Sequence, residues 1–188
     1  MKFNVLKSKA IKTLAVTALL LASLAGCGSS AGAGSASDSD IFRTMKTVDL
    51  EGNEFDSTVF AENKLTMVNV WNVGCTPCIM EIPELEKLDK DLEDFSVLGL
   101  YHSFTAGIPE EERGEIESII SDAKATYPQL EMSEDMVNSD EIQNLTAFPT
   151  TYFVDAEGNI VERVEGSNDY EGWKEVIENV MEKVDADA

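Results

Sequence analysis

The sequence predicts an α/β domain in which a central mixed β-sheet is flanked by helices. Two short apolar runs, at 64–71 and 95–101, have the length and composition of buried strands, and a segment with helical spacing follows each of them. A third observation is the stretch 150–166, in which two strand-like runs are separated by the turn AEGN, as in a β-hairpin. These segments give the order βαβαββα, which requires parallel and antiparallel strands in one sheet.

The helices are predicted from apolar side chains that recur at steps of three and four residues. The first runs to about Asp94 and contains Pro83, where a proline is expected to kink it. The segment 109–127 opens with a proline and acids, as helix N-termini do. A short acidic helix is predicted over 139–145, and the last helix over 170–184.

Ahead of the first buried strand, the stretch 42–60 reads as short strands around a turn at 52–53. An N-terminal β-hairpin is therefore expected to precede the main sheet. Because no internal repeat is visible, we expect one folded domain over 41–188.

The chain is strongly acidic, with 14 Lys and Arg against 36 Asp and Glu and a formal net charge of −22. Such a surface repels phosphates, so nucleic-acid binding is excluded as a function. The acidity is either a solvated surface or a feature that selects a basic partner.

The first 26 residues have the layout of an export signal. They begin with lysines and no acid, and continue into the apolar run TLAVTALLLASLAG, which is too short to remain as a membrane-spanning helix. The sequence LAGC that ends at Cys27 resembles the lipobox of bacterial lipoproteins. This resemblance implies cleavage of a signal peptide 1–26 and a lipid on Cys27, which would anchor the protein to the outer face of the cell membrane. An ordinary signal followed by an unrelated cysteine is the alternative.

The small and polar residues that follow, 28–40, are typical of a flexible tether. With Cys27 assigned to the lipid, the other two of the three cysteines form the pair Cys75-x-x-Cys78. In an extracytoplasmic location, this pair would sit where disulfides persist.

The pair has the minimum machinery for thiol–disulfide exchange. Cys75 lies just past a buried strand at the start of a helix, where unpaired backbone N–H groups favour a thiolate. Cys78 lies about one turn on, close enough to attack a mixed disulfide at Cys75. Thr76 and Pro77 occupy the bridge, and proline fits the first turn because its missing N–H is not needed there.

Two other uses of the pair stay open. A structural zinc site needs four ligands, and the chain adds only one histidine, His102, which we interpret as a polar residue at a strand end. A purely structural disulfide would close so short a loop that it gains little from loop entropy. It would make the protein a non-catalytic, tethered binding domain. We expect no metal and no cofactor.

Two stretches, VNVWNVGCTPCIMEIPEL at 68–85 and FPTTYFVDAEGNI at 148–160, resemble the signatures of the thioredoxin superfamily. They are most similar to its TlpA/ResA-like branch of membrane-tethered thiol–disulfide oxidoreductases, and the resemblance covers nearly all of 45–184. It implies a thioredoxin-like fold with an N-terminal β-hairpin and an inserted helix of the TlpA/ResA type. Peroxiredoxins share this fold, but they set their peroxidatic cysteine in a different motif, which this sequence lacks.

The resemblance also implies roles for individual residues. Cys75 would be the attacking thiol and Cys78 the resolving thiol. Pro149, preceded by Phe148, would be a cis-proline that lets a substrate strand lie beside the disulfide. Glu81 falls where ResA-like members carry an active-site glutamate, which could exchange protons with the thiols and raise their pKa. The alternative for Glu81 is a solvated helix glutamate.

The sequence departs from the family at two positions. Asn69 stands where thioredoxin has a buried aspartate, so that proton carrier is missing. Gly74 stands where a tryptophan usually precedes the first cysteine, which puts the substrate preference in doubt. Trp71 is expected either to pack in the core or to form a wall of the active site. The candidate substrate contacts are Trp71, Thr76, Pro77 and Phe148.

The direction of electron flow is predicted from charge. The bridge offers no positive charge, and the acidity of the domain disfavours a thiolate, so the dithiol should be a good electron donor. We therefore expect a reductase, with a thiol oxidase or disulfide isomerase as the alternative. The resemblance implies a membrane electron donor of the CcdA or DsbD type. Its substrates would be oxidised exported proteins such as apocytochrome c or methionine sulfoxide reductase.

Overall fold

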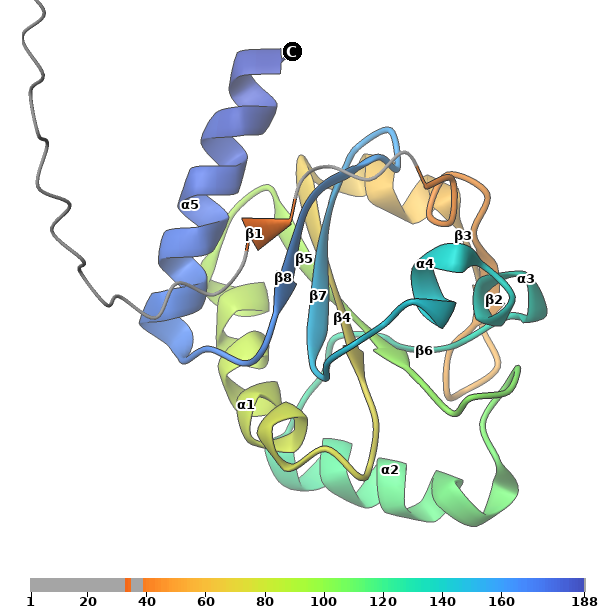
Figure 1. The fold of residues 1–188 in the computed structure, drawn as a ribbon. Helices are drawn as coiled ribbons and strands as arrows, with labels where there is room; N and C mark the ends of the chain where they lie inside the picture. Colours follow the sequence, from red (N-terminus) through yellow and green to blue (C-terminus); the bar gives the residue numbers. More distant parts are fainter. Residues whose placement is uncertain (1–32, 35–38, 188) are drawn as a thin grey trace, which may run out of the picture.

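The computed structural model describes residues 33–34 and 39–187 (Figure 1). The strands are β1 (Ala33–Gly34), β2 (Lys46–Val48), β3 (Glu54–Asp56), β4 (Leu65–Trp71), β5 (Phe95–Tyr101), β6 (Gln129–Glu131), β7 (Thr150–Asp155) and β8 (Ile160–Glu165). The helices are the 3₁₀ helix η1 (Ser57–Glu62), α1 (Thr76–Asp91), α2 (Glu110–Ala123), α3 (Glu134–Val137), α4 (Asp140–Gln143) and α5 (Tyr170–Asp187).

The main sheet is mixed, and its strand order is β1-β8-β7-β4-β5-β6. Strands β4, β5 and β6 are parallel, whereas β7 pairs antiparallel with β4, and β8 pairs antiparallel with β7. All seven residues of β4 are buried, because this central strand is covered on both faces. The predicted central mixed sheet is confirmed, and so is the N-terminal hairpin, which β2 and β3 form as a separate two-stranded sheet.

Each face of the sheet has its own core. The three long helices α1, α2 and α5 cover one face (Figure 1), where alternate residues of β4, such as Leu65 and Met67, meet Ile82, Leu85 and Trp173. The other face carries Val68 and Val70, and it is covered by residues 41–45, η1, α3 and α4. Asn69 has the same parity as Met67 and therefore faces α1.

The structure also contains elements that the sequence analysis misses. Strand β6 adds to the edge of β5, and an isolated bridge between Asp49 and Leu130 ties the loop of the hairpin to it. Helices η1 and α3 are likewise not predicted. Helix α1 ends at Asp91, three residues before the predicted end, and continues through Pro83.

The N-terminal predictions fall largely outside the described residues. The signal peptide 1–26 and Cys27 lie outside them, as does most of the tether 27–40. The exceptions are residues 39–40 and β1, which pairs antiparallel with β8. The two residues of β1, in the expected coil, are therefore extended, because an edge strand offers unpaired backbone groups to a neighbouring segment. No helix within 33–34 and 39–187 is long and apolar enough to cross a membrane.

A close approach between β5 and β6 depends on Gly99. A Cβ atom there would lie 2.0 Å from Oε1 of Gln129, which accepts a hydrogen bond of 2.9 Å from the buried Trp71 indole N–H. We expect Gly99→Ala to lower the free energy of unfolding by about 2 kcal/mol, since the Gln129 amide must move and leave the indole unpaired. Urea denaturation measures this.

The matched control is Gly114→Ala in α2, where no described atom lies within 4 Å of the new Cβ. It should be neutral or stabilise by up to about 1 kcal/mol, because alanine is the better helix former. Equal effects of the two substitutions would contradict the contact at Gln129.

Candidate active site

The two cysteines lie at the junction of β4 and α1. The strand ends at Trp71, and the Asn72 side chain then closes a turn by accepting a hydrogen bond of 2.9 Å from the Gly74 N–H. Cys75 is the N-cap of α1, and its Sγ accepts a hydrogen bond of 3.2 Å from the Cys78 N–H. The sulfur of Cys75 thus occupies the position at which a helix N-terminus stabilises negative charge.

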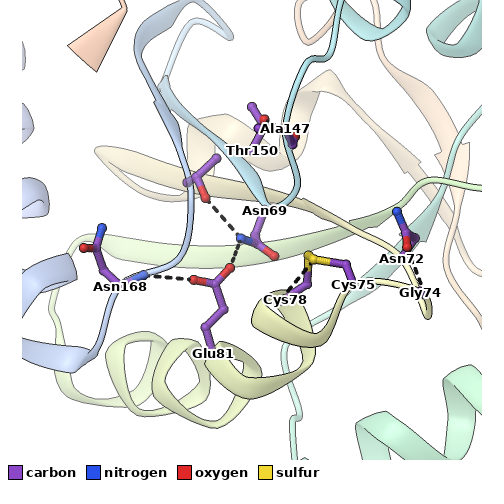
Figure 2. Close-up of a disulfide and its surroundings, with 10 residues drawn as sticks. Asn69, Asn72, Gly74, Cys75, Cys78, Glu81, Ala147, Thr150 and Asn168 are labelled. Carbon is purple, nitrogen blue, oxygen red and sulfur yellow. Dashed lines mark hydrogen bonds between the residues drawn. A yellow bond between two sulfur atoms is a disulfide. The ribbon is translucent and has the colours of Figure 1, made fainter. Parts of the chain in front are cut away.

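Cys75 and Cys78 form a disulfide with their Cα atoms 5.3 Å apart (Figure 2). Cys78 is fully buried against the core, whereas Cys75 is only half-buried. A large thiol or disulfide can therefore reach Cys75 first. This difference matches the roles of attacking thiol for Cys75 and resolving thiol for Cys78 that the resemblance implies.

The predicted cis-proline lies at the same end of the sheet. The Phe148–Pro149 peptide bond is cis. The register pairs Val70 with Thr150, so the residues just before Thr150 lie beside the carboxyl end of β4, from which the chain turns to the disulfide. Phe148 is half-buried and packs against both cores.

The other candidate substrate contacts differ in exposure. Thr76 and Pro77 are exposed in the first turn of α1, so they are accessible to a substrate. Trp71 is only 1% exposed. Its ring centroid lies 5.3 Å from that of Tyr101 in an edge-to-face arrangement. Its position supports the core-packing alternative rather than an accessible wall.

Glu81 is buried in α1, with 2% of its surface exposed. Its Oε1 accepts a hydrogen bond of 2.9 Å from Asn69 Nδ2, and its Oε2 accepts bonds from Trp173 Nε1 at 3.1 Å and from the Asn168 N–H at 3.3 Å. In the view of Figure 2, the Asn69 side chain lies between Glu81 and the disulfide, with its nitrogen toward Glu81. The alternative of a solvated helix glutamate is excluded.

Burial raises the pKa of Glu81 to about 7, and the hydrogen bonds from Asn69, Trp173 and Asn168 oppose this rise. A carboxyl group with such a pKa exchanges its proton readily at neutral pH. Position 69 itself carries an amide, and this amide donates to a titratable carboxyl group, that of Glu81 on helix α1.

Asn69→Ala should raise the pKa of Glu81 above its present value of about 7. The substitution removes the donor to Oε1, and a hydrogen bond to a carboxylate favours the charged form. Infrared titration of the buried carboxyl group, taken as a difference against Glu81→Gln, measures the change. Thr151→Val is the control, because the Thr151 hydroxyl accepts a hydrogen bond of 3.0 Å from Asn69 and is not itself a donor to Glu81 in the described structure. A larger shift in the control than in Asn69→Ala would contradict the assigned donor.

Two of the partners of Glu81, Trp173 and Asn168, are residues to which the sequence analysis gives no place at the site. Trp173 is predicted correctly to face inward from the last helix, but nothing in the sequence shows which group its indole N–H bonds. Asn168 contributes only its backbone N–H, which any residue except proline could supply.

His102 follows β5 and is 7% exposed. Burial lowers its pKa, so the imidazole is neutral at pH 7. Among the residues that the structure describes, no three His, Cys, Asp or Glu side chains are grouped so that they could hold a metal ion.

A sequence profile of the AhpC/TSA family matches residues 39–163, which include both cysteines, Glu81 and Pro149. The chain belongs to the AhpC/TSA family. The thioredoxin-like fold expected from the sequence is thereby confirmed, with its mixed sheet and flanking helices.

Known proteins of similar sequence and structure agree with the thioredoxin-like fold. The thioredoxin-like protein YneN of Bacillus subtilis is 31% identical over 118 residues, which cover 62% of this chain and 64% of the length of that protein. The thioredoxin domain of a thiol-disulfide oxidoreductase from Bacteroides vulgatus is 26% identical with a TM-score of 0.55, covering 80% of this chain and 96% of that domain. A thiol:disulfide interchange protein from Chlorobium tepidum has the same fold at 19% identity, with a TM-score of 0.60 over 73% of this chain and 93% of its own.

Proposed function

We propose that this protein is an extracytoplasmic thiol–disulfide oxidoreductase that reduces disulfides in exported proteins. The observation that carries the proposal is the arrangement of the Cys75–Cys78 disulfide, in which a half-buried sulfur caps a helix and a fully buried sulfur lies beneath it. The names of the similar proteins, a thiol-disulfide oxidoreductase and a thiol:disulfide interchange protein, support it.

The reaction transfers two electrons to the client protein. The Cys75 thiolate attacks one sulfur of the client disulfide, which forms a mixed disulfide and releases the other client sulfur as a thiolate. Cys78 then attacks the Sγ of Cys75, which releases the second client thiolate and forms the Cys75–Cys78 disulfide. The two protons of the dithiol end on the two client thiols, so the client is reduced and this protein is oxidised.

Glu81 is proposed as the group that accepts the proton of the buried Cys78. It lies one turn along α1 from Cys78, and its pKa of about 7 allows it to take up a proton and release it again at neutral pH. Cys78 is fully buried, so its thiol is closed to bulk solvent and an internal base can take its proton instead.

The proposed location follows from the N-terminal sequence. A lipid on Cys27 would hold the domain at the outer face of the membrane. There the reduced state would be regenerated by a membrane thiol-electron donor of the CcdA or DsbD type, since cytoplasmic reductants do not reach it. The mass of the N-terminal peptide of membrane-extracted protein tests the lipid: an unmodified Cys27 would contradict it.

The reduction potential of the pair, measured at equilibrium in redox buffers on a domain beginning at residue 39, tests the proposed direction. We expect about −250 mV or lower, as in thiol reductants. A value between about −120 and −180 mV would instead indicate an oxidase or isomerase. A disulfide that does not exchange with any thiol would indicate a non-catalytic binding domain.

A further inference from the structure

A second feature lies at the redox end of the sheet, next to the cis-proline. It is a pocket of about 340 Å³, which we call the aromatic pocket. Its walls are His102, Phe104, Val137, Ile142, Gln143, Leu145 and Phe148. A larger cavity of about 1190 Å³ adjoins residues 96–98 of β5, toward the opposite end of that strand.

The aromatic pocket is built from strand ends that converge near the disulfide. His102 follows β5, whose Tyr101 pairs with Trp71 at the end of β4. Its ring packs edge-to-face on Phe104 and on Phe148, with centroid distances of 4.5 Å and 5.0 Å. Since Phe148 immediately precedes the cis-proline, one wall of the pocket is continuous with the segment beside the disulfide.

Phe104 is unusual in its exposure and in its backbone. It is 75% exposed, and its φ of 63° lies in the left-handed region, which is unfavourable for a residue with a bulky side chain. Among the described residues, the only other large apolar side chain with comparable exposure is Met80 on α1, which does not line the pocket. An exposed aromatic ring held in this way at the rim of a pocket is typical of a binding surface.

Acidic residues lie on the two helices that border the pocket, outside its walls. Helices α3 and α4, which supply Val137 and Ile142 to its wall, carry the exposed acids Glu134, Asp135 and Asp140 in their first turns. The wall itself is uncharged, because burial lowers the pKa of His102. Aromatic and aliphatic walls between two helices that carry acids fit a large apolar side chain that has basic neighbours.

We propose that the aromatic pocket binds one large apolar side chain of the client polypeptide, close in sequence to the client cysteine and followed by Lys or Arg. The inference rests on the proposed function and adds to it the kind of sequence that is recognised. Gly74 leaves no apolar side chain directly before Cys75, so Phe104, from the loop between β5 and α2, supplies the apolar contact with the client.

The test uses short peptides whose single cysteine is disulfide-bonded to glutathione. A phenylalanine is placed at each position on either side of the cysteine in turn, with serine at that position in the reference peptide. Second-order rate constants are measured with the reduced protein, and oxidised glutathione is the reference substrate. We expect phenylalanine at one favoured position to speed exchange about tenfold over serine. Lysine beyond it should give a further gain that weakens as salt is added.

Two variants locate the contact. Phe104→Ser should reduce the phenylalanine-to-serine ratio to about one. Met80→Ser removes an equally exposed apolar side chain from α1 and should keep the ratio at its wild-type value. Both side chains are at the surface, so neither substitution disturbs the core.

Each other outcome is decisive. Equal rates for phenylalanine and serine peptides, with oxidised glutathione still exchanged, would overturn the pocket and leave the proposed function standing. No exchange with any disulfide would overturn the proposed function itself. A preference lost in Met80→Ser and kept in Phe104→Ser would place the contact on α1. A dimer that dissociates in Phe104→Ser would show that a second copy of the chain occupies the pocket.

Discussion

Cys75→Ser should abolish disulfide reduction, lowering the rate constant by at least about a thousandfold, the scale of loss when a nucleophile is removed. Cys75 is the half-buried sulfur at the helix N-terminus, and the only other cysteine of the pair is fully buried. Serine keeps the size of the side chain but cannot form the mixed disulfide. The measurement is the reduction of a glutathione-linked peptide by the pre-reduced protein.

Cys78→Ser is the matched variant and should fail at a different step. Cys75 can still attack the client, but no buried thiol resolves the mixed disulfide. We therefore expect a covalent client adduct that is stable on a non-reducing gel and absent from Cys75→Ser. The reverse pattern, with the adduct on Cys78, would contradict the assignment of the two roles.

The second large effect concerns the pH dependence of stability. The pKa of Glu81 is raised from 4.5 to about 7 in the folded protein. Between these values the native state binds more protons than the unfolded state, so the free energy of unfolding falls as the pH rises. Below pH 4.5 the carboxyl group is protonated in both states and carries no penalty. Above pH 7 the carboxyl group is charged in both states, and burying this charge lowers the free energy of unfolding by about 3 kcal/mol.

Glu81→Gln removes this titration and isolates it from the other carboxyl groups of the chain. The stability of the wild type minus that of Glu81→Gln should fall by about 3 kcal/mol between pH 4.5 and pH 7 and then become constant. Urea denaturation at a series of pH values gives this difference. The amide also lacks one acceptor for the donors that converge on Glu81, which shifts the whole curve but not its shape.

Glu84→Gln serves as the control for removing any one carboxylate from α1. Glu84 pairs at the surface with Lys87, at 2.8 Å. If the two substitutions change the curve in the same way, the effect does not come from the buried site.

Much of the fold could be predicted because its signals are local. Strands β4 and β5 are continuous apolar runs, and α5 shows one apolar face. The sequence also places Cys75 at a helix start, where the structure finds it as the N-cap. These features depend on residues close together in the chain, so periodicity and capping reveal them.

The missing elements have no such signal. Strand β6 is only three residues long and begins with the polar Gln129, so neither length nor alternation marks it. It is a strand because its backbone pairs with the edge of β5, and because Gly99 leaves room for the Gln129 side chain. The hydrogen bonding of Glu81 likewise depends on groups that are distant in sequence, since Asn168 and Trp173 are 87 and 92 residues away. A single sequence does not show that these residues meet.

The hydrogen bond from Trp173 to Glu81 also makes the surroundings of this carboxyl group depend on the packing of the last helix. Trp173 belongs to α5, whereas the other described donors to the carboxyl group come from β4 and from the segment just before α5. A chain in which α5 is not packed in place has both cysteines but lacks the Trp173 donor to Glu81. If Glu81 takes part in exchange as proposed, full activity requires that α5 is packed in place, and a chain that ends at residue 169 keeps both thiols but has no indole donor to Glu81.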